Sequence, residues 1–348
     1  MKYPEPSLRE LDCVIVGGGA AGLSAAVNMA RMRRGVLLVD ERDRFRWQHT
    51  IHNYLGFPDG VSATEIRRLG WRHAARYGAE LLLGHVATAT REGDRFRVRI
   101  ERLPESGAAR GAPGPAVARD EEMARLFGEV PQDGPLEVLA RTVILATGVF
   151  GHFPDFPGRD DCVGQSLFWC THCDGYGSID RVVGGVGHDE DAVQTALDLL
   201  VFTSRVTLVA GRTEGFEVPG SRLAELAANG IAAHACAVAE YANVDGEMTA
   251  LVLDDAARTR IPVEQVYTIR RTRAANDLAR QLGLELNPLG QIVVTSEQHT
   301  NVSGVYAAGD NTSLHDHQIS AAAHEGNQAA CGANYYLYTP AQRAPGDA

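Results

Sequence analysis

Residues 11–41, LDCVIVGGGAAGLSAAVNMARMRRGVLLVDE, limit the possible folds of this chain more than any other stretch. The β-branched run CVIVG leads into a glycine cluster, then into the alanine-rich segment LSAAVNMARM with few helix breakers, and then into the apolar run GVLLVD. These patterns predict a strand, a glycine turn, a helix and a second buried strand. The segment therefore indicates a β–α–β unit of a parallel sheet.

The glycine spacing within this unit predicts a dinucleotide site. Gly17, Gly19 and Gly22 form a GxGxxG pattern, which places backbone N–H groups and a helix N-terminus where a pyrophosphate binds. Asp40 ends the second strand about twenty residues later, where a carboxylate binds the ribose hydroxyls. The alternative is a tight glycine turn in an unrelated parallel sheet.

Length and charge restrict the classes of partner. The chain has 348 residues, which suggests about two domains, and its hydrophobic content of 45% is typical of globular proteins. Its net charge of −11 argues against nucleic acid and anionic membranes, because both require a basic surface. No run of eighteen apolar residues occurs, and the start MKYPEPSLRE lacks the apolar stretch of a signal peptide. We expect a cytoplasmic protein that acts on small molecules or other proteins.

Three further stretches outline the domains. The run RTVILATG predicts a buried strand that continues through Gly148 into a Pro/Gly-rich stretch, which we interpret as a crossing between domains. Near the C-terminus, GVYAAGD predicts a strand that runs into Asp310, and a helix of small residues follows. Residues 101–135 are rich in Pro, Gly and Ala, and we expect a surface insertion there.

Cys170 and Cys173 lie close together in the stretch FWCTHCDGY, whereas the other cysteines are scattered. In a reducing compartment, a CxxC pair is catalytic or metal-binding rather than a structural staple. A structural zinc site needs two further ligands at suitable spacing, and His172 and His188 are the candidates. The chain has no second CxxC and no HxxxH pattern, so the sequence disfavours a metal site.

The motifs GGGAAGLSAA, ATG, CTHCDGY and GVYAAGD occur in this order, and with them the chain resembles the low-molecular-weight thioredoxin reductase family of flavoproteins. The resemblance implies an α/β fold with two doubly wound, Rossmann-like three-layer ββα domains, and usually a homodimer. The FAD domain would be discontinuous, with residues 1–155 and 288–348 and an insertion near 101–135. Residues 156–287 would form the central, NAD(P)-domain-like part that carries the CxxC.

The resemblance also assigns residues to the cofactor. The glycine turn would hold the FAD pyrophosphate, Asp40 the adenosine ribose and Asp310 the ribityl chain, and Asn53 and Gly56 in HNYLGFP would line the flavin. Gln318 would start the helix that points at the pyrimidine edge of the isoalloxazine, where a helix N-terminus favours the anionic reduced flavin. The full set of expected FAD residues is Gly17, Gly19, Gly22, Asp40, Asn53, Gly56, Gly148, Asp310, Gln318 and His324.

By the same resemblance, the cysteine pair is redox-active. Cys173 would lie against the isoalloxazine, and Cys170 would attack the substrate disulfide by thiolate exchange. Asp174 would shuttle the proton, although it could instead be a helix cap or a turn acid. His172 departs from the family, which has a small or apolar residue between the cysteines, and an imidazolium there would stabilise a neighbouring thiolate.

The resemblance breaks down at the second nucleotide site, in RVVGGVGHDEDAVQTALDL. Gly187, Asp189 and Ala192 fall on the fingerprint positions, so an aspartate replaces the middle glycine. At about 4 Å and an effective dielectric near 20, like charges cost roughly 4 kcal/mol, and we expect poor NAD(P)H binding. A rival alignment takes residues 184, 185 and 187 as the turn, and the plain alternative is that the acids cap the helix. Of the basic cluster that binds the 2′-phosphate, only Arg212 is left.

With these departures the chain resembles an atypical, pyridine-nucleotide-independent branch of the family, which implies that it moves two electrons between FAD and the CxxC and on to a thioredoxin-like protein or a small disulfide. Its donor would be ferredoxin or a second flavin rather than NADPH. His324 replaces a glycine near the flavin, where it would tune the ring, stack on a ligand or only fill space. The alternatives are a dithiol oxidase that uses oxygen, an NADPH-dependent thioredoxin reductase and a non-catalytic flavin redox sensor.

Overall fold

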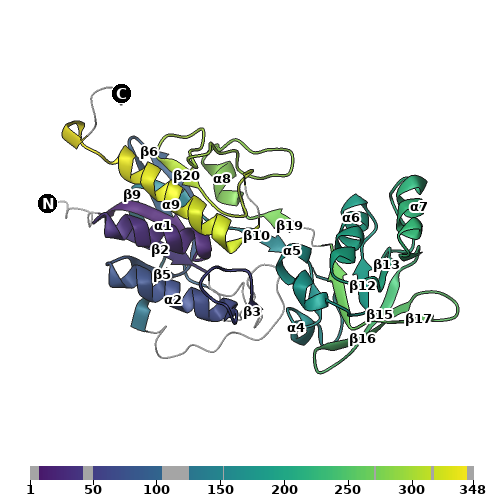
Figure 1. The fold of residues 1–348 in the computed structure, drawn as a ribbon. Coiled ribbons are helices and arrows are strands. Elements are labelled where there is room, and N and C mark those ends of the chain that lie inside the picture. Colours follow the sequence, from purple (N-terminus) through teal and green to yellow (C-terminus); the bar gives the residue numbers. More distant parts are fainter. Residues whose placement is uncertain are drawn as a thin grey trace. The chain divides into compact units, whose positions relative to one another are not determined.

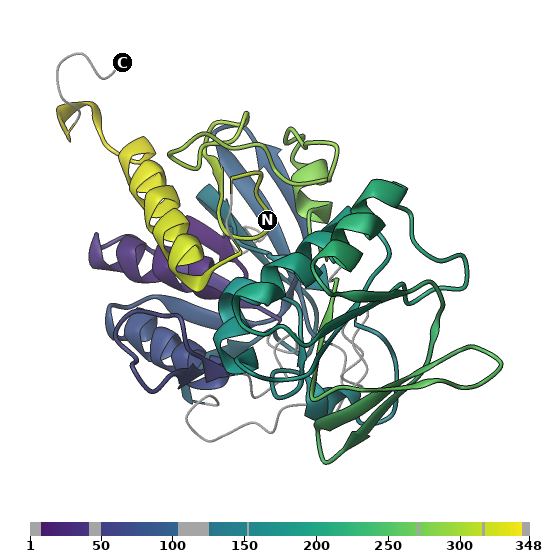
Figure 2. The same ribbon diagram turned by 45° about the vertical axis from the view of Figure 1, so that its right-hand side comes forward.

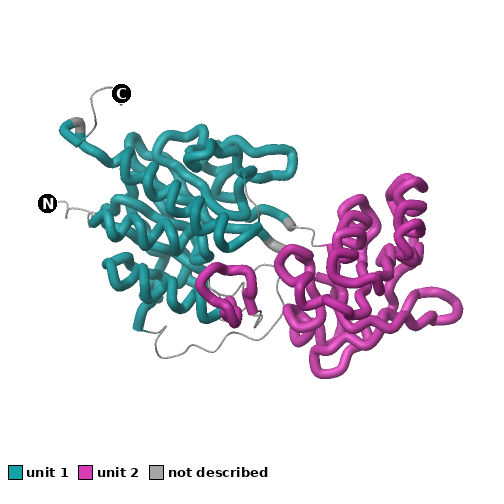
Figure 3. The backbone as a smooth tube through the Cα atoms, in the orientation of Figure 1, with its two compact units in different colours: residues 1–46, 64–150, 272–348 teal, residues 47–63, 151–271 magenta. Residues whose placement is uncertain are grey.

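A computed structural model describes residues 8–41, 50–103, 125–151, 153–269, 272–314 and 317–342 (Figure 1). The chain divides into two compact units (Figure 3): unit 1 comprises residues 1–46, 64–150 and 272–348, and unit 2 comprises residues 47–63 and 151–271. Most of the insertion expected near 101–135 falls outside the described residues.

The division differs from the expected domain bounds at three places, one of which is that residues 151–155 group with unit 2. Residues 272–287, which we expected in the central domain, belong to unit 1, because Leu278, Ala279 and Leu284 pack in its core. Residues 47–63, expected in the FAD domain, group with unit 2. The composition of residues 47–63 and 272–287 does not indicate to which unit they belong, because this depends on tertiary packing.

Unit 1 is built on one large sheet with the strand order β6-β7-β9-β1-β2-β5-β8, and β20 pairs with β9. The pairs β1–β2, β1–β9, β2–β5, β5–β8 and β9–β20 are parallel, whereas β6–β7 and β7–β9 are antiparallel. The strands are β1 (Arg9–Val16), β2 (Val36–Asp40), β5 (Glu80–Leu83), β6 (His85–Glu92), β7 (Arg95–Glu101), β8 (Phe127–Glu129), β9 (Leu136–Leu145) and β20 (Val305–Ala307).

The parallel strands form a middle layer: helices cover one of its faces, and the antiparallel end of the same sheet, β6 and β7, packs over the other. Side chains of β1 alternate between the layers: Cys13 and Ile15 pack with the helices, and Val14 and Val16 pack with β6 and β7. The covering helices are α1 (Ala20–Arg31), α2 (Ala63–Arg76) and α9 (Ile319–Tyr336), and α8 (Asp277–Gln281) lies with the opposite core. Helices α1 and α9 run side by side in both views (Figures 1 and 2).

Unit 2 contains a five-stranded parallel sheet in the order β11-β18-β12-β13-β14. One face packs under α6 (Glu190–Asp198), and the other packs against an antiparallel sheet of three strands. The parallel strands are β11 (Leu167–Phe168), β12 (Val183–Val186), β13 (Val206–Val209), β14 (Ala232–His234) and β18 (Gln265–Thr268). The antiparallel strands are β15 (Val238–Val244), β16 (Glu247–Leu253) and β17 (Arg260–Pro262), and α7 (Gly220–Ala228) follows β13.

Short elements complete the described chain. Strands β3 (Thr50–Ile51) and β4 (Val61–Ser62) form a small hairpin, and β10 (Val149–Gly151) pairs with β19 (Thr272–Ala274). The short helices are α4 (Arg159–Cys162), α5 (Thr171–Asp174), η1 (Gly175–Ser178), η2 (Leu199–Val201) and η3 (Pro340–Gln342). None of the helices in the described ranges is long and apolar enough to span a bilayer. Both units are Rossmann-like α/β structures, as the sequence predicted.

Candidate flavin and disulfide sites

The first glycine turn of unit 1 requires glycine at two of its three positions. Gly17 has φ +108°, and a Cβ there would lie 2.2 Å from the carbonyl oxygen of Ala146. A Cβ at Gly22 would lie 1.9 Å from the carbonyl oxygen of Gly17, because α1 packs directly on the turn. The turn is anchored by the Gly17 N–H, which donates to the Val39 carbonyl at 2.8 Å. Glycine is therefore needed at both positions by the packing of the turn itself.

Gly19 is different, since the space around it is open. It is the N-cap of α1, has no side chain that could cap the helix, and has no atom within 4 Å of its ideal Cβ position. The first turn of α1 contains no acidic residue. Open space beside the free N–H groups of a twelve-residue helix is what a pyrophosphate needs, so the residues present fit the FAD that the resemblance implied.

Asp40 lies next to this turn and is paired with a residue that the sequence analysis did not find. It is the last residue of β2, is 7% exposed, and its Oδ2 accepts a hydrogen bond from Arg67 Nη2 of α2 at 2.7 Å. A Cβ at Gly18 would lie 2.4 Å from the same carboxylate oxygen. Asp40 is thus held against the turn, where a ribose acid is expected. Arg67 carries no motif, and only the packing of α2 reveals its role.

Further predicted residues of unit 1 lie between the end of β20 and the first turns of α9. The Asp310 side chain is 34% exposed, and its Oδ2 lies 3.6 Å from His317 Nδ1. Gln318 is the N-cap of α9 with extended backbone, and Gly148 has φ +64° after β9. His324 is an exposed residue of α9. Gln318 thus lies at the start of α9, and Asp310 lies in the loop between β20 and α9. The contacts of both residues with a flavin, and the effect of His324 on a flavin, stay predictions.

One acid in this region was missed. Glu325 is 5% exposed, and its Oε2 accepts a hydrogen bond from the Gly309 backbone N–H at 2.6 Å. This contact ties the second turn of α9 to the loop that carries Asp310. A buried glutamate within a run of small residues was the available signal, because acids are seldom buried without a partner.

The remaining predicted FAD residues, Asn53 and Gly56, lie in the loop between β3 and β4. Both are exposed, and Gly56 has φ +101°. This loop belongs to unit 2. Their contact with a flavin stays a prediction.

Unit 2 carries the cysteine pair, and the two sulfurs are joined in a disulfide. Cys170 is the N-cap of α5, directly after β11 and Trp169, and its Sγ accepts the backbone N–H of Cys173 at 3.1 Å. A helical turn begins there because the backbone N–H groups of Cys173 and Asp174 both donate to the Cys170 carbonyl, at 3.2 and 3.1 Å. The turn brings the Cα atoms of the two cysteines to 5.3 Å, a usual distance for a disulfide. Within the described ranges, no three His, Cys, Asp or Glu residues cluster as metal ligands do.

Asp174 has the electrostatic property expected of a proton carrier. Burial raises the pKa of its carboxyl from 3.8 to about 7, so the group exchanges protons near neutral pH. It is the last residue of α5 and is half-buried, one residue beyond Cys173. His172, in contrast, is exposed. The four predicted catalytic residues thus share one helical turn. Cys170, Cys173 and Asp174 are partly buried in it, and His172 is exposed.

The predicted nucleotide turn of unit 2 is capped by the side chain of Asp189. Asp189 is the N-cap of α6, and its Oδ1 accepts the backbone N–H of Ala192 at 3.2 Å. Glu190 and Asp191 follow in the first turn of the helix. The cap that we considered as the plain alternative is therefore formed. The rival alignment is wrong, because residues 184 and 185 lie inside strand β12 rather than in the turn.

Arg212, the remaining cation of the expected phosphate cluster, is engaged by two glutamates. Its Nη1 donates to Glu217 at 2.6 Å and its Nε to Glu214 at 3.1 Å, and these contacts raise its pKa. The backbone N–H of Glu217 donates to the His188 carbonyl at 2.7 Å, which fixes this loop beside the turn. A phosphate at this place would have to displace two carboxylates.

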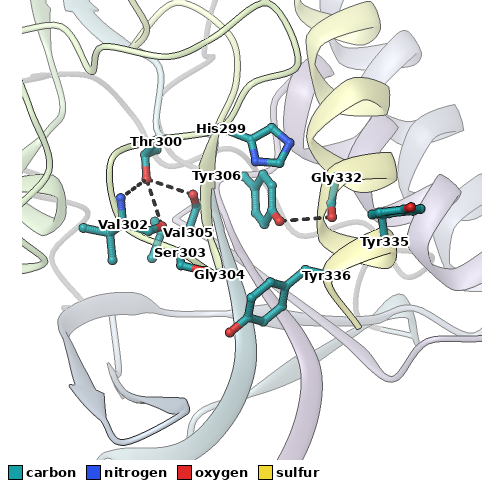
Figure 4. A pocket seen from close by; sticks show the side chains of 10 residues that line it. All are labelled: His299, Thr300, Val302, Ser303, Gly304, Val305, Tyr306, Gly332, Tyr335 and Tyr336. Atoms are coloured by element: carbon teal, nitrogen blue, oxygen red, sulfur yellow. Dashed lines mark hydrogen bonds between the residues drawn. The ribbon is translucent and has the colours of Figure 1, made fainter. Parts of the chain in front are cut away.

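Unit 1 also has a small cavity of about 240 Å³ (Figure 4). It is lined by His299, Tyr306 and the C-terminal part of α9, and the Tyr306 hydroxyl donates to the Gly332 carbonyl at 3.0 Å. The start of β20 and the end of α9 form this cavity, whereas Asp310 and Gln318 lie at the opposite ends of these elements. The cavity is therefore separate from the predicted flavin residues.

Comparisons with known proteins agree with this architecture. The family model described as "Pyridine nucleotide-disulphide oxidoreductase" matches residues 11–329. "Thioredoxin reductase tcpT" of Claviceps purpurea is 28% identical over 316 residues, with 87% of each chain covered. A component of alkyl hydroperoxide reductase from Xanthomonas campestris is 27% identical over 346 residues, but the chain spans only 59% of that relative's length. The crystal structure of HlmI has a TM-score of 0.77 at 27% identity, covering 94% of this chain and 92% of that one.

Proposed function

The chain belongs to the pyridine nucleotide-disulphide oxidoreductase family, and we propose that within it the protein exchanges electrons between FAD and the Cys170–Cys173 pair without using NAD(P)H. The family and the class of enzyme follow from the comparisons, since thioredoxin reductase-like flavoproteins and disulfide oxidoreductases are its relatives. The electron donor and the substrate are the parts that we propose.

The residues of unit 2 support a thiol–disulfide mechanism. Bound FAD supplies a two-electron redox centre. Opening the Cys170–Cys173 disulfide takes up two electrons and two protons, and Asp174, with a pKa of about 7, holds one proton at its carboxyl and releases it near neutrality. The dithiol then reduces a substrate disulfide: the Cys170 thiolate attacks one sulfur, and Cys173 resolves the mixed disulfide. The pair returns to its oxidised form and the substrate leaves as a dithiol.

The observation that carries the proposal on the donor is the Asp189 cap. A carboxylate stands where a nucleotide-binding turn needs a bare backbone, and it already uses the Ala192 N–H that would face a pyrophosphate. Two more acids follow in the same helical turn, and Arg212 is bound by glutamates. Repulsion of roughly 4 kcal/mol from one carboxylate at about 4 Å is nearly a thousandfold in affinity.

A donor other than a nicotinamide is then needed, and we infer a redox protein such as ferredoxin, or a second flavin. We infer a thioredoxin-like protein or a small disulfide as the acceptor, and a homodimer as the assembly. These inferences rest on the resemblance and on the printed name of the relative tcpT. The cytoplasmic location stays a prediction.

Anaerobic titration of the yellow protein tests the choice of donor. We expect dithionite to bleach the flavin absorbance fully, and NADPH or NADH at micromolar concentration to leave it unchanged within minutes. Rapid bleaching by micromolar NADPH would overturn the proposal. A colourless protein that takes up no FAD would overturn the flavin assignment as well.

A dithiol oxidase is the second candidate, and the same Asp189 cap favours it. Electrons would flow from a dithiol substrate through Cys170 and Cys173 to the flavin and then to oxygen, which needs no nucleotide turn. Oxygen consumption with a dithiol substrate separates this direction from disulfide reduction. The double variant Cys170→Ser with Cys173→Ser abolishes turnover in either direction, whereas a non-catalytic sensor has no turnover to lose.

A further inference from the structure

Tyr267 contacts the chain on both sides of the disulfide-bearing turn. It lies in β18, is fully buried, and its ring centroid is 5.4 Å from that of Phe168, two residues before Cys170. Its hydroxyl lies 2.9 Å from the Oγ of Ser178, five residues after Cys173. One side chain therefore touches the start and the end of the segment that contains the redox pair.

Ser178 extends this contact into a small polar network. It is fully buried, and its Oγ donates to Gln265 Oε1 at 2.6 Å. Because the single hydroxyl proton of Ser178 is used there, the Tyr267 hydroxyl is the donor to Ser178. Gln265 in turn donates through Nε2 to the Gly177 carbonyl at 3.2 Å. Three hydrogen bonds thus fasten η1 to strand β18.

Packing closes the remaining side of the turn. The Phe202 ring lies where a Cβ of Gly175 would be, with the nearest ring carbon 2.3 Å from that position. Gly175 directly follows Asp174, so the helical turn is pressed between Phe202 and the polar network. Apolar packing and directional hydrogen bonds together make this segment rigid.

We propose that Tyr267, Ser178 and Gln265 are positioning residues that hold Cys170 and Cys173 in disulfide geometry and thereby set how readily the pair is reduced. The inference deepens the proposed function, because it rests on this pair being the redox couple. Their hydrogen bonds hold η1, which directly follows α5 in the chain.

The direction of the effect follows from effective concentration. A turn that holds two thiols close together favours the disulfide over the dithiol, since ring closure then costs little conformational entropy. Loosening the turn favours the dithiol and makes the pair easier to reduce. A tenfold change in the equilibrium constant of this two-electron couple corresponds to about 30 mV.

The test compares Tyr267→Phe with a matched control, Tyr306→Phe. Both substitutions remove one buried hydroxyl and keep the ring. Tyr306 donates to Gly332 in unit 1 (Figure 4), whereas Cys170 and Cys173 belong to unit 2. Each protein, as purified with its flavin, is equilibrated anaerobically in dithiothreitol redox buffers. Thiols are then trapped by alkylation, and peptide mass spectrometry gives the oxidised fraction of the Cys170–Cys173 peptide.

We expect Tyr267→Phe and Ser178→Ala each to shift the equilibrium three- to tenfold toward the dithiol, and the double variant to shift it no further than the larger single change. Tyr306→Phe should leave the equilibrium within error of the wild type. An unshifted Tyr267→Phe, or an equal shift in Tyr306→Phe, would refute the proposal. Should Tyr267→Phe fail to fold, Ser178→Ala and Gln265→Ala decide by the same criterion. The readout does not depend on the electron donor, so it can fail independently of the NADPH titration.

Discussion

The chain builds the same strand–turn–helix unit twice, and the two copies differ at the helix cap. Gly19 in unit 1 has φ −79° and ψ −172°, and Asp189 in unit 2 has φ −105° and ψ −174°, so the backbones are nearly the same. Beside Gly19 the space is open, whereas at Asp189 the carboxylate itself accepts the helix N–H. A nucleotide turn can thus be kept or closed by one side chain without changing the fold.

The charged residues around the two turns differ in the same way as the caps. In unit 1, Arg67 neutralises the buried Asp40 beside the turn, and the first turn of α1 carries no acid. In unit 2, Glu190 and Asp191 follow the cap, and the nearby Arg212 is held by glutamates. The local charge therefore suits an anion in the first turn and repels one in the second.

Exchanging the caps gives the largest expected effect. Gly19→Asp should lower the affinity for FAD by roughly 4 kcal/mol, close to a thousandfold, because a carboxylate would face the pyrophosphate. The fold should persist, since aspartate is at least as good an N-cap as glycine. Flavin-to-protein absorbance ratios after gel filtration and circular dichroism measure the two quantities.

The neutral variant Gly19→Asn is the control for size. It should retain more flavin than Gly19→Asp, because it adds the same bulk without the charge. A Gly19→Asp protein that keeps its full flavin content would contradict the account of the first turn.

The next largest effect concerns the two partly or fully buried aspartates beside the proposed sites. Asp40 is ion-paired with Arg67. At Asp174, burial raises the pKa of the carboxyl from 3.8 to about 7. A carboxyl whose pKa is raised in the folded state binds its proton more tightly there than in the unfolded chain. Its contribution to stability is full below about pH 4 and is lost as the pH rises to about 7.

We expect the free energy of unfolding of the wild type to fall relative to Asp174→Asn by about 2 kcal/mol between pH 4 and pH 7.5. A shift of one pKa unit corresponds to about 1.4 kcal/mol, and partial exposure of the group reduces the sum. Urea unfolding across this range checks the prediction. Equal pH slopes in both proteins would show that Asp174 does not titrate in this window.

The smallest expected effect tests whether Asp189 caps its helix rather than binds a nucleotide. Asp189→Ala should lower the free energy of unfolding by about 1 kcal/mol, because it leaves the Ala192 N–H without its acceptor. Flavin content should not change. Thermal unfolding and the absorbance ratio test both points, and a loss of flavin equal to that of Gly19→Asp would erase the contrast between the turns.

Local patterns in the sequence were sufficient for the turns but not for their surroundings. The GxGxxG spacing, Asp40 and Asp189 are short-range signals, because strand, turn and helix are neighbours in the chain. Arg67 and Tyr267 could not be found in this way, since each reaches its partner from a distant segment.

The division into units also depends on contacts between distant segments. Residues 272–287 contain no break in composition, and only the packing of Leu278 and Ala279 assigns them to unit 1. The pairing of Arg212 with Glu214 and Glu217 was in principle accessible, because all three lie within six residues of one another.

Calorimetric titration of NADPH into the flavin-loaded protein tests the contrast between the turns most directly, with Asp189→Gly/Glu190→Gln as the companion variant. Glycine at the cap costs only a few tenths of a kcal/mol, so the variant should stay folded. We predict no measurable heat of binding for the wild type at micromolar concentrations and a gain of at least tenfold in affinity for the variant. A micromolar dissociation constant for the wild type, unchanged by the two substitutions, would contradict the account.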